Sequence, residues 1–182
     1  ILKNRHADSW YVEPFVGGCN AIDKVTGRRL GNDINPYLIS MWNALVYNEW
    51  KPSIYSKEEH AHIRLNKGLY PQHVVGWVGF NCSYSGVFFG GFAGQVKTKT
   101  GLIRNYQDEA IRNVQKQIPM LNGITFTNNN YQRITIPDNS IVYCDPPYKS
   151  TSAYKIGAFN HNEFWEWVRK ISIKNQVFIS EY

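Results

Sequence analysis

The chain has 182 residues, which is enough for one sizeable core and a small insertion. Its hydrophobic content of 43% excludes an intrinsically disordered chain. A formal net charge of +6 gives mild support to an anionic partner such as nucleic acid, and an ordinary basic protein is the alternative. The three cysteines form no CxxC pair, which disfavours a disulfide framework or a structural zinc site and indicates a reducing cytoplasm.

The first predicted strand covers residues 10–16 and runs directly into Gly17-Gly18. Glycines after a strand allow a tight turn and a close approach of a ligand to the backbone. The pair does not form the G-x-G-x-x-G dinucleotide fingerprint, so taken alone it is a weak signal.

A second strand is predicted over residues 29–34, and a helix follows from Pro36 to about residue 49. Asn35 is a good N-cap, and proline is favoured at the first helical position. In nucleotide-binding α/β folds an acid at the end of the second strand accepts hydrogen bonds from ribose hydroxyls, and Asp33 is placed for that role. The alternative is that Asp33 only helps to cap the helix.

Residues 50–121 interrupt the alternation of strands and helices. A helix is predicted over residues 57–66, and its His60 and His62 are expected to be solvated, because two residues apart they do not share a helical face. Residues 74–94 are dense in aromatic residues and glycine, and a basic run follows. This combination is typical of a surface that stacks on bases and contacts phosphates, although an inserted hydrophobic subdomain with a solvated loop explains it equally well.

The second half of the chain returns to the regular pattern. We predict helices over residues 105–117 and 162–173 and strands over residues 123–127, 140–144 and 176–180. Together these elements predict an α/β fold with a mostly parallel sheet and helices on both faces.

The predicted strand 140–144 ends in Asp145-Pro146-Pro147-Tyr148. Two prolines remove two backbone donors and fix φ twice, so the chain must leave the sheet at a rigid elbow. The Asp145 carboxylate and the Pro146 carbonyl form an acceptor pair suited to the two hydrogens of an exocyclic base amine. Tyr148 offers a ring that can stack on that base. The structural alternative is a proline-rich turn with a capping aspartate.

Three ordered motifs carry a family resemblance. Motif I of the Dam-type DNA adenine methyltransferases resembles the string Val12-Glu13-Pro14-Phe15-Val16-Gly17-Gly18. Their motif II resembles the string around Asp33. Motif IV of the amino methyltransferases resembles Asp145-Pro146-Pro147-Tyr148. After motif I the family usually continues with a third glycine or a small residue and then valine, and Cys19 and Asn20 depart from that pattern. The resemblance implies a Rossmann-like methyltransferase fold with an inserted target-recognition subdomain, and phage or prophage relatives carry similar aromatic and glycine strings there.

The resemblance also assigns site residues. Its implied catalytic set is Asp145, Pro146, Pro147 and Tyr148. Its implied contacts to S-adenosylmethionine are Glu13, Pro14, Phe15, Gly17, Gly18, Asp33, Asn130, Tyr131 and Asp145. The candidate DNA contacts are Tyr84, Phe88, Phe89, Lys97, Lys99, Arg104 and Lys149.

These assignments predict an enzyme that methylates the N6 amine of a flipped adenine in double-stranded DNA. The catalytic domain is expected to comprise residues 1–49 and 122–182, and the target-recognition region residues 50–121. A cytoplasmic monomer without a metal or a membrane anchor is expected. Cytosine-N4 methylation shares the chemistry, and RNA or protein methylation on the same fold is a more distant alternative.

A further alternative is a catalytically impaired DNA-binding fragment. The sequence starts at Ile1 without a methionine and stops at Tyr182 after an apolar run, so we expect it to be cut at both ends. In the resembling family a Gly-Lys motif near the N-terminus also contacts the cofactor, and it is not found in these residues.

Overall fold

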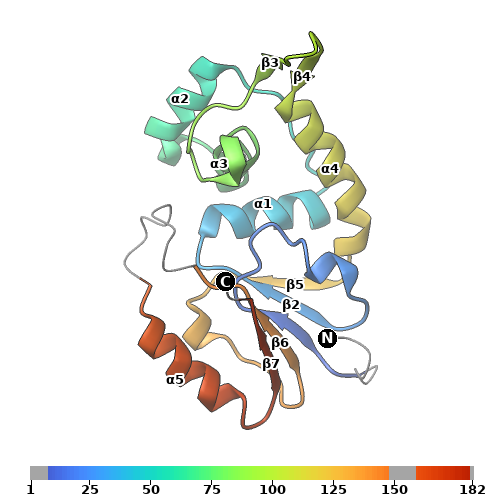
Figure 1. Cartoon of the computed structure of the whole chain (residues 1–182), viewed down its shortest axis with the longest axis vertical. Coiled ribbons are helices and arrows are strands. Elements are labelled where there is room, and N and C mark those ends of the chain that lie inside the picture. Colours follow the sequence, from blue (N-terminus) through green and yellow to red (C-terminus); the bar gives the residue numbers. More distant parts are fainter. Residues whose placement is uncertain (1–7, 148–158, 181–182) are drawn as a thin grey trace. The chain divides into compact units, whose positions relative to one another are not determined.

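The computed structural model describes residues 8–147 and 159–180 (Figure 1). The chain divides into two compact units. The sheet unit consists of Ile1–Ile34 and Gly123–Tyr182, and the inserted unit consists of residues 35–122, which lie between these two segments in the sequence.

The sheet unit contains five strands and one α-helix among its described residues. They are β1 (Tyr11–Glu13), β2 (Arg29–Asn32), β5 (Ile124–Thr127), β6 (Ile141–Cys144), α5 (His161–Ile171) and β7 (Gln176–Ile179). Short 3₁₀ helices occur at Ile22–Lys24 and Tyr131–Arg133. The inserted unit contains α1 (Pro36–Tyr47), α2 (Lys57–Leu65), α3 (Gln72–Asn81), β3 (Gln95–Lys97), β4 (Ile103–Asn105) and α4 (Tyr106–Leu121), with 3₁₀ helices at Lys67–Leu69 and Tyr84–Gly86.

The five strands form one sheet in the order β5-β2-β1-β6-β7, and every neighbouring pair is parallel. The chain adds β2 and then β5 on one side of β1, and β6 and β7 on the other. The order of the strands therefore reverses between β1 and β6, which is the switch point where open α/β sheets bind ligands. The predicted α/β fold with a parallel, Rossmann-like sheet is confirmed.

The strands of the sheet unit have continuous apolar sequences because they are buried in its core. Val12 and Val142 are paired in the β1–β6 register and are fully buried. Phe164, Trp167 and Val168 of α5 pack in the same buried cluster as these two valines. Asn160 starts α5 because its side chain accepts hydrogen bonds from the backbone N–H groups of residues 162 and 163.

The inserted unit has its own core, built on the packing of α1 against α3. Gly76 of α3 allows this contact, since a Cβ at that position would lie 2.2 Å from the backbone oxygen of Tyr37. Trp77 is fully buried and its indole Nε1 donates to the carbonyl of Ser53 at 3.1 Å. Helix α1 begins as predicted, because the Asn35 side chain accepts from the N–H groups of Tyr37 and Leu38.

Four features of the inserted unit differ from the prediction. Helix α3 and the β3–β4 hairpin were not predicted, and α4 runs on to Leu121 through Pro119. The prediction of a solvated His60 was wrong: the residue is 4% exposed, and its Nε2 lies 2.9 Å from the Ser83 hydroxyl. Burial lowers the pKa of His60, which favours the neutral ring.

No helix within residues 8–147 and 159–180 is long and apolar enough to cross a membrane.

We predict that Gly76→Ala destabilises the inserted unit. The new methyl group must displace the α1 backbone at Tyr37, so the free energy of unfolding should fall by roughly 1–3 kcal/mol despite the better helix propensity of alanine. Urea unfolding monitored by tryptophan fluorescence measures this loss.

Gly68→Ala is the matched control, because a Cβ there meets no atom within 4 Å. An equal effect of the two substitutions would show that the α1–α3 contact does not depend on Gly76.

Candidate functional site

The candidate site lies at the carboxyl edge of the parallel sheet, where three acidic residues follow one another across neighbouring strands. Glu13 is the last residue of β1, Asp33 comes directly after β2, and Asp145 comes directly after β6. Since β1 and β6 flank the point where the strand order reverses, these carboxylates belong to the edge at which a ligand is expected.

The amide of Asn32 connects three of the segments that form this edge. Its Nδ2 donates to the carbonyls of Pro14 and Asn129 at 3.0 and 2.9 Å. Its Oδ1 accepts from the hydroxyl of Thr127 at 2.9 Å and from the N–H of Asn129 at 3.0 Å. The amide is fully buried, and these four bonds use both of its hydrogens and both acceptor positions of its oxygen. Sequence reasoning missed Asn32 because its partners are up to 97 residues away in the chain.

The turn after β1 is held against Asp33. The N–H of Gly17 donates to Asp33 Oδ2 at 3.2 Å, and the N–H of Val16 donates to the carbonyl of Asn32 at 2.7 Å. Asp33 is also fixed through its backbone, since its N–H donates to the carbonyl of Thr127 and its carbonyl accepts from Asn128 Nδ2 at 2.8 Å. The predicted residues Gly17 and Asp33 are therefore brought together.

Two residues of this turn have left-handed backbone conformations. Gly17 has φ of +46°, and a Cβ there would meet no atom within 4 Å. Cys19 has φ of +58° although it is not glycine, which is an uncommon conformation for a residue with a side chain. Cys19 is fully buried, and burial together with the nearby carboxylates of Glu13, Asp23 and Asp33 raises the pKa of its thiol. Gly18, the next predicted contact, is exposed.

Glu13 is an acid in an unfavourable place for a charge. It is 3% exposed, and its Oε1 has no hydrogen-bond partner among residues 8–147 and 159–180. Burial raises the pKa of Glu13 to about 8, a hydrogen bond from Tyr11 opposes this rise, and the charges of Asp23 and Asp145 add to it. A buried carboxyl group with an unpaired oxygen is suited to receive a donor or a cation from a ligand.

The elbow after β6 presents its acid to solvent. Asp145 is exposed, whereas Pro146 is buried and Pro147 is partly buried. The preceding Cys144 remains paired in the sheet, where its carbonyl accepts from the N–H of Ser180 at 2.8 Å. Tyr148, the fourth residue predicted for this elbow, lies outside the described residues, as does the predicted DNA contact Lys149.

Two further predicted cofactor contacts, Phe15 and Tyr131, belong to an aromatic cluster of the sheet unit. The rings of Phe15 and Tyr131 are 5.2 Å apart, and both also contact Phe159 and Phe164. The side chain of Asn130 caps the 3₁₀ helix Tyr131–Arg133 by accepting from the N–H of residue 132. This capping bond is a structural role that the sequence did not reveal.

The predicted DNA contacts in the inserted unit have very different exposures. Phe89 is only 6% exposed and packs against His60, so the described structure leaves its ring no open face for a base. Phe88 is partly buried and stacks on Tyr37 with 5.6 Å between the ring centroids. Tyr84 is 45% exposed.

The basic residues are the more accessible members of the predicted set. Lys97 ends β3, Lys99 lies in the turn of the hairpin and Arg104 lies on β4, and all three are exposed. They therefore place three cations on one short β-hairpin.

Among the described residues, no group of three or more His, Cys, Asp or Glu side chains is arranged to hold a metal ion.

Comparison with protein families gives one match that spans nearly the whole chain. The family model described as D12 class N6 adenine-specific DNA methyltransferase matches residues 1–74 and 77–174.

We predict that Glu13→Gln changes how stability depends on pH. The folded protein keeps a proton on Glu13 up to a pKa of about 8, whereas the unfolded chain releases it near 4.5. The free energy of unfolding of the unmodified protein should therefore fall between about pH 4.5 and pH 8, relative to the glutamine variant, by roughly 2–4 kcal/mol. Urea titrations at pH 5, 7 and 9 measure the difference, and parallel profiles for the two proteins would refute it.

Proposed function

The chain belongs to the D12 class N6 adenine-specific DNA methyltransferase family, and we propose that it transfers the methyl group of S-adenosylmethionine to the N6 amine of an adenine flipped out of duplex DNA. Membership of this family makes it an adenine-specific DNA methyltransferase. The single observation that carries the proposal further is the row of acids Glu13, Asp33 and Asp145 at the switch point of the parallel sheet.

The residues at this edge fit the chemical groups of S-adenosylmethionine. A carboxylate is the usual partner of a ribose diol in nucleotide-binding sheets, and Asp33 stands at the end of the second strand. The buried Oε1 of Glu13 has no partner among the described residues and suits a cationic group of the methionine part. The charge of such a ligand favours the ionised carboxylate and so opposes the effect of burial on the pKa of Glu13. At Gly17 the absence of a side chain leaves the backbone open to the ligand. When bound, S-adenosylmethionine supplies an electrophilic methyl group.

Asp145 and the carbonyl of Pro146 orient the nucleophile in this proposal. The lone pair of an exocyclic amine is delocalised into the base, so the amine is a poor nucleophile. Two acceptors that hold its hydrogens direct the lone pair out of the ring plane and toward the methyl group. Fixing two reactants in such a geometry contributes up to roughly 7–11 kcal/mol of barrier reduction. Once methylated, the amine nitrogen is acidic, and at this solvent-exposed position it releases its proton to water.

The target amine must leave the duplex before it can reach Asp145. Flipping a base costs a few kcal/mol of stacking and pairing free energy, which contacts to the flipped base and the DNA backbone must offset. We assign these contacts to the region of residues 50–121, where Tyr84, Lys97, Lys99 and Arg104 are exposed. We assign catalysis to residues 1–49 and 122–182, a division that includes α1 although this helix belongs to the compact inserted unit.

We predict that Asp145→Ala abolishes methylation without unfolding the protein. The side chain is exposed, so its loss leaves no cavity, but the amine loses one of its two acceptors. The rate should fall by at least about 100-fold, the usual effect of misplacing a reacting group. Digestion of methylated DNA to nucleosides and quantification of N6-methyladenine and N4-methylcytosine measures both the rate and the target base.

Asp138→Ala is the matched control, because it removes an exposed aspartate near the amino end of the same strand, β6. It should keep its activity. Unchanged methylation by the Asp145→Ala variant would contradict the catalytic role of Asp145. Formation of N4-methylcytosine would show that the target base is cytosine and not adenine.

A further inference from the structure

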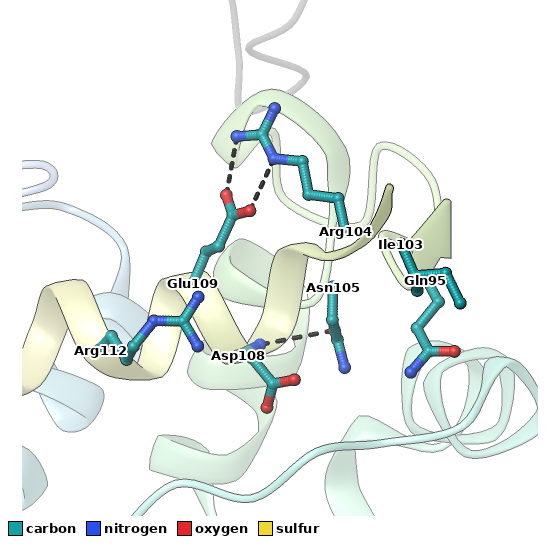
Figure 2. Close-up of a pocket in the computed structure, with 7 residues that line it drawn as sticks. All are labelled: Gln95, Ile103, Arg104, Asn105, Asp108, Glu109 and Arg112. Atoms are coloured by element: carbon teal, nitrogen blue, oxygen red, sulfur yellow. Dashed lines mark hydrogen bonds and ion pairs between the residues drawn. The ribbon is translucent and has the colours of Figure 1, made fainter. Parts of the chain in front are cut away.

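Arg104 of β4 is paired with Glu109 of α4 at one side of a polar pocket (Figure 2). The guanidinium Nε lies 2.6 Å from Glu109 Oε1, and Nη2 lies 2.7 Å from Oε2. The same guanidinium lies 4.8 Å from the ring centroid of Tyr106. The pair is therefore a fork-to-fork contact in a fixed orientation and not a loose surface attraction.

Glu109 accepts hydrogen bonds from the same N–H groups of Arg104 that would bind a phosphate. A guanidinium binds a carboxylate or a phosphate through the same pair of parallel N–H groups, so Arg104 cannot offer this fork to both partners at once. The hydrogen bond to Arg104 lowers the pKa of Glu109, so the competing group is ionised at neutral pH.

Glu109 lies in a pocket that has both acidic and basic side chains. The adjoining β3–β4 hairpin carries the exposed cations Lys97 and Lys99, and Arg112 lines the same pocket as Glu109. Asp108 is the other acid of this pocket, but it forms no ion pair with Arg104. Among the ion pairs within the described part of the chain, the one that holds a cation of the hairpin is formed by Glu109.

We propose that Glu109 is an internal competitor of DNA phosphate for Arg104, which lowers the affinity of the enzyme for DNA until a backbone phosphate displaces it. This inference rests on the proposed function, because it takes duplex DNA as the partner. In this arrangement Arg104 exchanges one anion for another on binding, and Tyr106 supports the guanidinium in both states.

A purely structural role for the pair accounts less well for its position. The side chains of Arg104 and Glu109 are 51% and 29% exposed, so a phosphate can reach the pair from solvent. Helix α4 does not need Glu109 to begin, since Asn105 caps it by accepting from the N–H groups of residues 107 and 108.

The test measures binding of the whole chain to a random-sequence DNA duplex at several salt concentrations. We expect Glu109→Gln to tighten binding about two- to fivefold, which corresponds to the free energies typical of exposed ion pairs. Arg104→Gln should weaken binding and reduce the slope of log K against log salt by about 0.9, the value for one lost phosphate contact. Circular dichroism confirms that each variant is folded.

Two matched controls separate competition from a general change of charge. Asp108→Asn removes a carboxylate from the same turn of α4, and Glu58→Gln removes one from the first turn of α2. Both should change affinity less than Glu109→Gln. An equal tightening in Asp108→Asn would overturn the proposal in favour of a long-range field effect.

The double variant Arg104→Gln/Glu109→Gln gives the decisive comparison. If the two side chains compete as proposed, Glu109→Gln has no effect once Arg104 is absent. Weaker binding of Glu109→Gln would show that Glu109 instead positions Arg104, and would overturn the proposal. If the unmodified chain binds and methylates DNA, such a result leaves the proposed function intact, whereas failure of the unmodified chain to bind DNA overturns both.

Discussion

The edge of the sheet depends on the buried amide of Asn32. Four hydrogen bonds join it to the turn after β1 and to the segment after β5, so three chain segments that are distant in sequence are held at one place. An amide is suited to this position because it supplies two donors and an acceptor without a charge. Loss of any partner would leave a polar group buried and unpaired, which makes the arrangement of the edge cooperative.

With the backbone fixed in this way, similar acids acquire different properties from their surroundings. Glu13 is buried and tends to keep its proton, Asp33 is engaged by the N–H of Gly17, and Asp145 faces solvent. The same edge of the sheet therefore has a buried carboxyl group, a carboxylate held in place by a hydrogen bond and a carboxylate open to solvent. In the proposed reaction these serve the cation, the ribose and the target amine.

The sequence was sufficient for the sheet and for the acids at its edge, because strands and caps depend on neighbouring residues, as at Asn35. It was not sufficient for α3, whose residues 75–79 are all buried and therefore show no amphipathic period. Buried His60 is paired with Ser83 and packs against Phe89, and both partners are more than 20 residues away in the sequence, where no local pattern reveals them. The Asn32 network likewise consists of contacts distant in sequence.

The most direct test of the account is a calorimetric titration of the chain with S-adenosylmethionine, for the unmodified protein and for Asp33→Asn. Asparagine keeps an acceptor for the N–H of Gly17 but removes the charge proposed to bind the ribose. We predict micromolar binding to the unmodified protein and at least about tenfold weaker binding to the variant, equivalent to about 1.4 kcal/mol. No binding to a folded unmodified protein, or equal binding to both, would contradict the assignment of this edge as the cofactor site.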